Sequence, residues 1–470
     1  MSRHDAKAAA DTAPDEHAAD DTAETAGGTP RGRKKVALVV GAGLVAAAVG
    51  ATVAVVVVQG TGSAEADPVA ATVPVALSAR VPDGTTLGVV LTLGSGEGSE
   101  WAGAAQGARV AQERLALGGT DVALVTEDDG GTEDGARAAV DALVEQGVAG
   151  VVVAASGAHV AGAVEAASAA GVPVVLPYAE LPEGTDAGAA WSLAPDAAAT
   201  SAALSTALDG TSRPLVVDVG GGVPADVPVG DVLVVAPRDD PATLTTELVR
   251  RAGLAPPAEE GEEPPVPVDA PIDAVVVSGP PARQADLVEV LQSADLPVPV
   301  VLTPGATSPA FSSALAEAGG SASGGFVTVG TATDDAVALQ ADAAGRSMSA
   351  FLAGVRVAAT DGDVQNLTDD QPFSAVAQEA DSRSHDAVVA LVRGVAEAGS
   401  TTPSDVAVAL AATTPGAAQG IAGPALDLGR ASASTGEVVV LHASPQSLGL
   451  RPAAGDATTR TTWFAEPDAD

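Results

Sequence analysis

Residues 87–126 decide the fold, and they read LGVVLTLGSGEGSEWAGAAQGARVAQERLALGGTDVALVT. A short Val/Leu run at 87–91 precedes an Ala-rich amphipathic segment at 102–117, and a second apolar run follows at 121–126. Short runs of branched side chains predict buried strands, and the longer amphipathic segment predicts a helix. The stretch is therefore predicted to be a strand–helix–strand unit whose two strands lie parallel in one sheet.

The same alternation continues along the chain. We expect further helices at 132–146, 159–170 and 386–399, and further strands at 150–154, 173–176, 215–219, 232–235, 274–277, 298–302 and 437–442. An acidic, proline-rich stretch at 255–271 interrupts the second half and predicts an exposed loop, because proline disrupts both helices and central strands. The pattern predicts an α/β protein with two doubly wound parallel-sheet lobes.

The N-terminal region has a different character. Residues 1–35 lack a regular pattern of apolar residues, and we expect them to form a disordered cytoplasmic tail. Residues 36–58 form an uncharged apolar run directly after basic residues. As a helix, that run would span ~35 Å, which is enough for a single-pass transmembrane signal anchor in the cell membrane, with the main domain extracytoplasmic. A cleavable signal peptide ending near the Ala-Glu-Ala at 64–66 is the alternative. Residues 59–84 are expected to be a linker.

Composition excludes several classes of protein. The chain has 22 Lys and Arg against 61 Asp and Glu, a net charge of -39, and no Cys. So acidic a surface repels nucleic acid, and the lack of Cys excludes disulfides, zinc–cysteine sites and iron–sulfur clusters. The His residues have no metal-ligand spacing, and no catalytic motif is present. We therefore expect no metal site, no cofactor, no nucleic-acid partner and no enzymatic activity.

Four stretches carry a resemblance to a known family. They are 87–111 with Glu100-Trp101, 127–157 with Ser156-Gly157, 171–179, and 384–401 with Ser-His-Asp-Ala. Together they resemble the type I periplasmic binding proteins, specifically the branched-chain amino-acid (Leu/Ile/Val) substrate-binding family of ABC transporters. The resemblance implies an extracytoplasmic solute-binding protein that captures a small polar ligand, such as an amino acid or an amide, for an ABC permease. The alternative is a membrane-anchored surface module with a degenerate binding-protein fold, used for protein interaction or sensing.

The resemblance also implies a three-crossover hinge between the lobes. We expect the crossovers near 194–212, 326–334 and 426–437. Lobe 1 would then comprise 85–205 and 334–426, and lobe 2 would comprise 206–333 and 427–445. Residues 446–470 would form a C-terminal tail.

The same resemblance places candidate ligand-binding residues in lobe 1. Ser156 and Gly157 stand between a strand and a helix, where the family holds an amino-acid carboxylate; a simple helix cap is the alternative. Trp101 could form an apolar wall, and Tyr178 and Ala179 end a strand at the expected cleft rim; ordinary packing is the alternative. Glu180 replaces a hydroxyl residue, and it would favour a cationic or neutral ligand if it faced the cleft rather than solvent.

Lobe 2 departs from the family pattern. After the strand at 215–219 the family has a helix, whereas here a Gly- and Pro-rich run, 220–230, leads straight into the next strand. A missing crossover helix would uncover one face of the sheet or change the strand order. No ligand-binding residue is therefore predicted in lobe 2.

Overall fold

The computed structural model describes residues 74–185, 189–239, 241–254, 271–323, 325–452 and 460–465. The expected cytoplasmic tail, the expected membrane anchor and most of the expected acidic loop lie outside these residues. Within the described ranges, no helix combines the length and the apolar character needed to cross a membrane. Both lobes belong to one unit, which begins at Ala70.

Lobe 1 is built on a parallel five-stranded sheet of order β2-β1-β3-β4-β5. Its strands are β1 (Thr86–Leu91), β2 (Ala123–Asp128), β3 (Val151–Val153), β4 (Val174–Leu176) and β5 (Ala190–Ser192). In β1, Val89 packs into the core on one face and Val90 into the core on the other, and both are fully buried. Burial on both faces explains the continuous apolar runs in the sequence.

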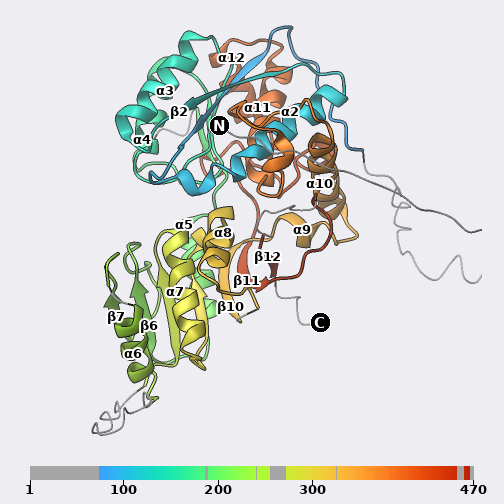
Figure 1. Cartoon of the computed structure of the whole chain (residues 1–470). Helices are drawn as coiled ribbons and strands as arrows, with labels where there is room; N and C mark the ends of the chain where they lie inside the picture. Colours follow the sequence, from blue (N-terminus) through green and yellow to red (C-terminus); the bar gives the residue numbers. More distant parts are fainter. Residues whose placement is uncertain are drawn as a thin grey trace, which may run out of the picture. The chain divides into compact units, whose positions relative to one another are not determined.

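Helices cover both faces of this sheet. Figure 1 shows α3 and α4 together on one side and α2, α11 and α12 on the other. Their bounds are α2 (Gly107–Leu117), α3 (Glu133–Glu145), α4 (Val160–Ala170), α11 (Ser382–Ala398) and α12 (Pro403–Ala411), and α10 (Ala343–Thr360) packs beside α2. Polar side chains cap the N-termini of two of these helices. At α3 the Thr132 hydroxyl accepts from the Gly135 N–H, and at α11 the Asp381 carboxylate accepts from backbone N–H groups. The predicted doubly wound architecture of this lobe is confirmed.

Lobe 2 contains a seven-stranded sheet of order β12-β11-β10-β9-β8-β6-β7. Its strands are β6 (Pro214–Asp218), β7 (Asp231–Val234), β8 (Ala274–Ser278), β9 (Val300–Leu302), β10 (Phe326–Thr331), β11 (Val438–Ser444) and β12 (Thr462–Ala465). The helices are α5 (Ala197–Ala207), α6 (Pro241–Arg251), α7 (Pro281–Ser293) and α8 (Pro309–Glu317). β6 to β10 are parallel, whereas β11 and β12 add an antiparallel edge. The segment expected to be a tail from 446 onward thus contributes β12 to the sheet.

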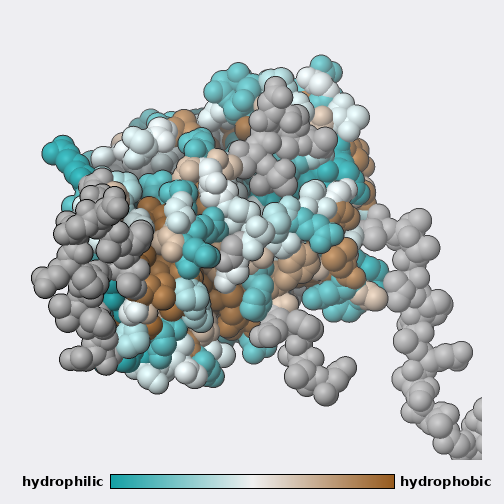
Figure 2. Space-filling view, turned by 60° about the horizontal axis from the view of Figure 1, so that its bottom comes forward, coloured by the Kyte–Doolittle hydropathy of each residue, from teal (hydrophilic) through white to brown (hydrophobic). Residues whose placement is uncertain are grey.

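The region between β6 and β7 follows the expected departure from the family pattern. Residues 219–230 contain no helix, and Val227 from this connection packs against the sheet with only 8% of its surface exposed. Val232 and Val234 of the edge strand β7 remain exposed, at 37% and 70%. Brown areas between hydrophilic ones in Figure 2 show apolar residues reaching the surface on one face of the molecule. The missing helix therefore leaves part of the sheet uncovered.

Two boundaries in the first half of the chain differ from the sequence prediction. α5 falls inside the range assigned to lobe 1, but it packs on β10 and β11 of lobe 2, so the first crossover is the short stretch 193–196. Residues 74–84, assigned to the linker, pack on lobe 1: Leu77 is buried and its N–H donates to the Arg114 carbonyl at 2.8 Å. Both differences arise from tertiary packing of Ala- and Leu-containing segments.

The lobes are joined by neighbouring chain segments. The other two crossovers are 332–333 and 434–437. Residues 427–433, assigned to lobe 2 from the sequence, therefore belong to lobe 1, where Leu428 and Ala433 lie in the core. The first and third crossovers approach each other at their lobe 1 ends, where Ser192 and Ser432 form a parallel bridge. The Ser192 N–H donates to the Ala431 carbonyl, and the Ala433 N–H donates to the Ser192 carbonyl, each at 2.8 Å. This pairing fixes both segments at the edge of the lobe 1 sheet.

Candidate ligand-binding cleft

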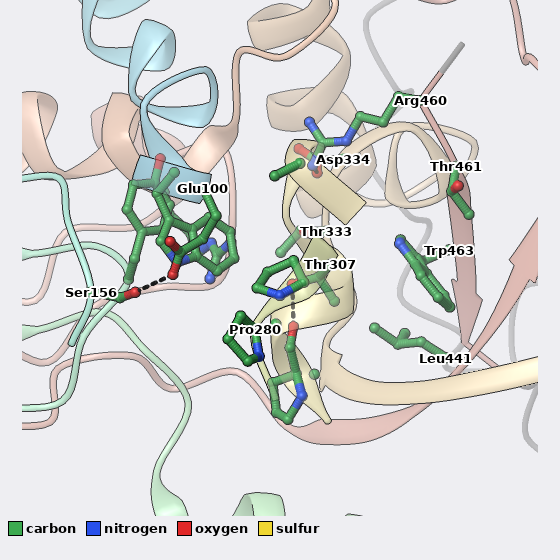
Figure 3. Close-up of a pocket in the computed structure, with 18 of the residues that line it drawn as sticks. Glu100, Ser156, Pro280, Thr307, Thr333, Asp334, Leu441, Arg460, Thr461 and Trp463 are labelled. Atoms are coloured by element: carbon green, nitrogen blue, oxygen red, sulfur yellow. Dashed lines mark hydrogen bonds and ion pairs between the residues drawn. The ribbon is translucent and has the colours of Figure 1, made fainter. Parts of the chain in front are cut away.

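A cavity of about 1010 Å³ lies at the carboxyl ends of the strands of both sheets. From lobe 1 it is lined by the segments that follow β1, β3 and β4, and from lobe 2 by those that follow β6, β8 and β9, together with the end of β10. In parallel α/β sheets, this end of the strands is where ligands bind. Figure 3 shows Glu100 and Ser156 on one side and Thr307, Pro280 and Trp463 on the other.

Ser156 faces the cavity, but its hydroxyl is engaged within the protein. Ser156 Oγ donates to Glu100 Oε1 at 2.7 Å (Figure 3), and the Gly98 N–H donates to Glu100 Oε2 at 2.9 Å. Ser156 does not cap α4, because the residue before that helix is His159 and no side chain accepts there. Glu100 thus lies where the sequence predicted a ligand carboxylate.

Gly157 lies beside a second carboxylate. Its φ of 107° is unfavourable for any side chain, and a Cβ atom there would lie 2.4 Å from Cδ of Glu97. Glu97 and Glu100 both line the cavity, and neither forms an ion pair with any described residue. This wall of the cavity therefore carries uncompensated negative charge.

Trp101 and Tyr178 form an aromatic pair at the lobe 1 rim. The rings stack with centroids 4.5 Å apart, and the Arg383 guanidinium lies 4.7 Å from the Trp101 centroid and 4.8 Å from that of Tyr178. The Tyr178 hydroxyl donates to Asp381 Oδ1 at 3.1 Å. Burial, reinforced by the Asp381 charge, raises the pKa of Tyr178 well above its ordinary value. Only 6% of Trp101 and 7% of Tyr178 are exposed, so both rings present little surface to the cavity that they line.

Ala179 and Glu180 do not line the cavity. Ala179 is buried, and its carbonyl accepts from the Ser192 hydroxyl at 2.7 Å. Glu180 is exposed, and partial burial together with the nearby Asp196 raises the pKa of its carboxyl. Of the six residues predicted, the structure brings Trp101, Ser156, Gly157 and Tyr178 together at the cavity.

The C-terminal segment supplies cavity residues that the sequence prediction missed. Arg451, Arg460, Thr461 and Trp463 line the cavity, and Trp463 also packs against Phe311 and Phe326 in the lobe 2 core. The run TTWFA at 461–465 is rich in β-branched and aromatic residues, which is typical of a strand and was the available signal. Among the described residues, no group of three or more His, Asp or Glu side chains could hold a metal ion.

Comparison with known proteins agrees with this architecture. A family model described as a periplasmic binding protein matches residues 84–217. The chain has the type I periplasmic binding protein fold. No curated protein matches the sequence.

Solved structures with the periplasmic binding protein fold align over most of the chain. A type 1 periplasmic binding protein from Bordetella pertussis Tohama I is 17% identical, covers 81% of this chain and 99% of its own, and has a TM-score of 0.53. The branched-chain amino acid transporter substrate-binding protein LivJ from Streptococcus pneumoniae, in complex with isoleucine, is 16% identical, with 76% and 99% coverage and a TM-score of 0.53. The leucine-binding protein LivK from Thermotoga maritima is 16% identical, with 81% and 98% coverage and a TM-score of 0.54. All three are described as binding proteins.

Proposed function

We propose that this chain is an extracytoplasmic solute-binding protein that captures a small polar ligand between its lobes and delivers it to an ABC permease. The observation that carries the proposal is the cavity of about 1010 Å³ at the carboxyl ends of the strands of both sheets. Its size is typical of a small-molecule site. LivJ, which shares this fold, is a transporter substrate-binding protein.

The connections between the lobes suit a closing motion. Rotation about the short segments 193–196, 332–333 and 434–437 would bring the two walls of the cavity together around a ligand. Closure buries a bound molecule and changes the surface that a permease would recognise. The ligand then holds the closed state by contacting both lobes.

Charge favours a ligand whose end near Ser156 is cationic or neutral. Glu97 and Glu100 have no ion-pair partner in the described ranges. The other charged side chains that line the cavity are paired with one another or with Asp381; they are Asp334, Asp335, Arg383, Arg451 and Arg460. A second carboxylate about 4 Å from Glu100 would be repelled by ~1 kcal/mol or more, depending on the local dielectric. Amines and amides are therefore better candidates than molecules that present a carboxylate at this wall.

A thermal-shift panel tests the proposal on the full-length chain. Amino acids, amides, polyamines and sugars are added separately, and a ligand present at 100 times its Kd should stabilise the protein by ~2.7 kcal/mol. One class that raises the Tm in a saturable manner supports solute binding. No response from any compound in the panel contradicts it.

The second candidate is a membrane-anchored surface module that retains the fold without the ligand. It is favoured by the engagement of Ser156 with Glu100 and by the stacking of Trp101 on Tyr178, since both leave few free groups at the predicted subsite. Saturable binding of a panel compound, detected by calorimetry as well as by the Tm shift, would exclude this module.

We also propose that residues 36–58 anchor the chain, with the N-terminus cytoplasmic. The proposal rests on the uncharged apolar run and the basic residues that precede it. Retention in membranes after a high-salt wash is the expected result. A soluble protein that begins near Asp67 would instead indicate a cleaved signal peptide.

A further inference from the structure

The C-terminal segment leaves lobe 2 after β11, contacts lobe 1, and returns to lobe 2 as β12. On the way, Leu450 packs against the cluster that contains α10, and its carbonyl accepts from Arg356. Arg451 Nη1 donates to the Ala380 carbonyl at 2.7 Å and to the Gln378 carbonyl at 3.3 Å. Besides the three crossovers, the lobes are thus held together by side chains of this segment.

Two ion pairs tie Arg451 and Arg460 to a helix of lobe 1. α9 (Asp334–Val337) follows the second crossover directly and packs on α10. Arg460 Nη2 lies 2.8 Å from Asp334 Oδ2, and Arg451 Nε lies 2.8 Å from Asp335 Oδ1. We call Asp334, Asp335, Arg451 and Arg460 the arginine clamp. The exposed fractions of the four side chains lie between 5% and 16%, so solvent screens these pairs only weakly.

The electrostatics of the clamp favour its charged form. Burial alone would raise the pKa of Asp334, but the charges of Arg460, Arg451 and Arg383 together lower it below the ordinary value. Burial by itself would also lower the pKa of Arg460, whereas Asp334, Asp381 and Asp335 together raise it. Removing Arg460 would leave the buried Asp334 carboxylate with only the longer contact to Arg451, at 3.4 Å.

The backbone at Asp334 is adapted to this position. Its φ is 59°, in the left-handed region that few residues other than Gly, Asn and Asp adopt. The turn directs the carboxylate toward Arg460 and Arg451 at the point where the chain enters lobe 1. Asp334 lies three residues after β10, and Arg460 lies two residues before β12. The ion pair therefore joins the start of α9 in lobe 1 to the residues that lead into β12 of lobe 2.

The clamp also adjoins the ligand cavity. All four of its residues line the cavity, and so do Thr461, Thr462 and Trp463, which follow Arg460 directly. Figure 3 shows Asp334 next to Arg460, with Thr461 and Trp463 nearby. We infer that the arginine clamp sets the spacing of the two lobes at the hinge and thereby the width of the cleft, with Arg451 and Arg460 as positioning residues. The effect on cleft width rests on the proposed function, whereas the effect on lobe spacing is measurable without a ligand.

The absence of Cys from the chain makes lobe spacing directly measurable. Asp141 on α3 and Asp286 on α7 are exposed, one in each lobe, and each is replaced by Cys in the full-length chain and spin-labelled. Pulsed electron paramagnetic resonance then gives the distribution of interlobe distances. The unmodified clamp should give one narrow distribution.

Arg460→Gln and Asp334→Asn are the test variants. Asn tolerates the positive φ at 334, so Asp334→Asn removes the charge and preserves the backbone. Each variant should shift the distribution to longer distances and broaden it, and Arg460→Lys, which keeps the charge, should restore it in part. Arg137→Gln is the matched control, because Arg137 pairs with Glu133, Asp134 and Glu165 wholly within lobe 1, and it should leave the distribution unchanged.

A purely structural role predicts a different result. If Arg460→Gln or Asp334→Asn lowers the Tm but keeps the wild-type distance distribution, the inference is overturned. If Arg460→Gln does not fold, Asp334→Asn and Arg460→Lys decide the outcome by the same criterion. A thermal-shift panel without any response would contradict solute binding and leave the distance result in place.

Discussion

The indole ring of Trp101 lies parallel to the phenol ring of Tyr178, with the two planes only 6° apart. The contact joins the 3₁₀ helix η1 (Ser99–Trp101) to Tyr178, which lies two residues after β4. The Tyr178 hydroxyl in turn bonds to Asp381, which caps the start of α11. Three segments distant in sequence are thereby fixed at the rim of the cleft. This pair organises lobe 1 as well as lining the cavity.

Replacing Tyr178 should separate stacking from hydrogen bonding. Tyr178→Phe keeps the stack and loses the hydroxyl bond to Asp381, so the free energy of unfolding should fall by about 1 kcal/mol. Tyr178→Ala also removes the ring, and the loss should reach about 3–5 kcal/mol. Urea denaturation measures both values. Equal losses for the two variants would show that the stack contributes no stability.

Removing the charge of Glu100 should change ligand preference. In Glu100→Gln the amide oxygen can still accept from the Gly98 N–H, and the amide nitrogen can donate to the Ser156 hydroxyl. The side chain no longer attracts a cation, so affinity for an amine-bearing ligand should fall by roughly tenfold. Carboxylate-bearing compounds should bind better than they do to the wild type. Isothermal calorimetry measures both, with Glu145→Gln on the exposed face of α3 as the control. Unchanged preference would exclude this wall as the charged end of the site.

Gly157→Ala should destabilise the protein by steric conflict with Glu97 as well as by backbone strain. Gly220→Ala is the matched control, because Gly220 has a similar φ of 118° but its Cβ would meet only Pro280 Cδ at 3.6 Å. We expect a cost of about 1–3 kcal/mol from strain in each, and a further loss only at Gly157. Glu97→Ala should recover that further loss in the double variant. Thermal denaturation is measured for Gly157→Ala, Gly220→Ala, Glu97→Ala and the double variant. A double variant no more stable than Gly157→Ala would show that the side chain of Glu97 does not conflict with a Cβ atom at position 157.

Stability should depend on pH through His385, which is fully buried in α11. Its Nε2 lies 2.8 Å from Arg114 Nη1 and its Nδ1 lies 2.8 Å from Asp386 Oδ1. Since Arg114 can only donate, Nε2 accepts, and the neutral ring donates from Nδ1 to Asp386. Burial, partly opposed by the Asp386 bond, lowers the pKa of His385 below 6.5.

The direction in which stability changes with pH follows from proton binding by His385. A lowered pKa means that the unfolded chain binds the proton more readily, so this contribution is fully present above pH ~6.5 and declines as the pH falls through 6.5 toward the folded-state pKa. The free energy of unfolding of the wild type minus that of His385→Gln, measured from pH 8 to 5, should decrease over this window. A flat difference would show that His385 titrates alike in both states.

The inner strands β1, β3 and β4 of lobe 1 were predictable because burial on both faces imposes continuous apolar runs, as in Val151–Val153 of β3. β5 was not predicted, since its three residues, Ala190–Ser192, form no apolar run. The lobe to which α5 belongs was not predictable, since an Ala-rich helix has no strongly apolar face to indicate which sheet it covers. β12 is only four residues long, and its place in the sheet depends on pairing with β11.

The candidate site was predictable only in part. Ser156 and Gly157 could be placed at the cleft from their position between a strand and a helix. The Ser156–Glu100 hydrogen bond joins residues 56 positions apart, and no local pattern encodes it. The clamp pairs Arg460 with Asp334 over 126 positions, beyond the reach of periodicity or spacing.

The helix-free connection before β7 has a consequence for how the protein opens. β7 has one neighbouring strand, its side chains at 232 and 234 are exposed, and only one residue of α6, Leu248, is buried. Local opening of this edge breaks few apolar contacts, so the amide protons of β7 should exchange with deuterium much faster than those of β8. All five residues of β8 are buried. Lobe 2 is therefore expected to unfold in stages. The half of its sheet next to the hinge and the cleft should stay folded, whereas the edge formed by β7 and α6 should open locally at a lower free-energy cost.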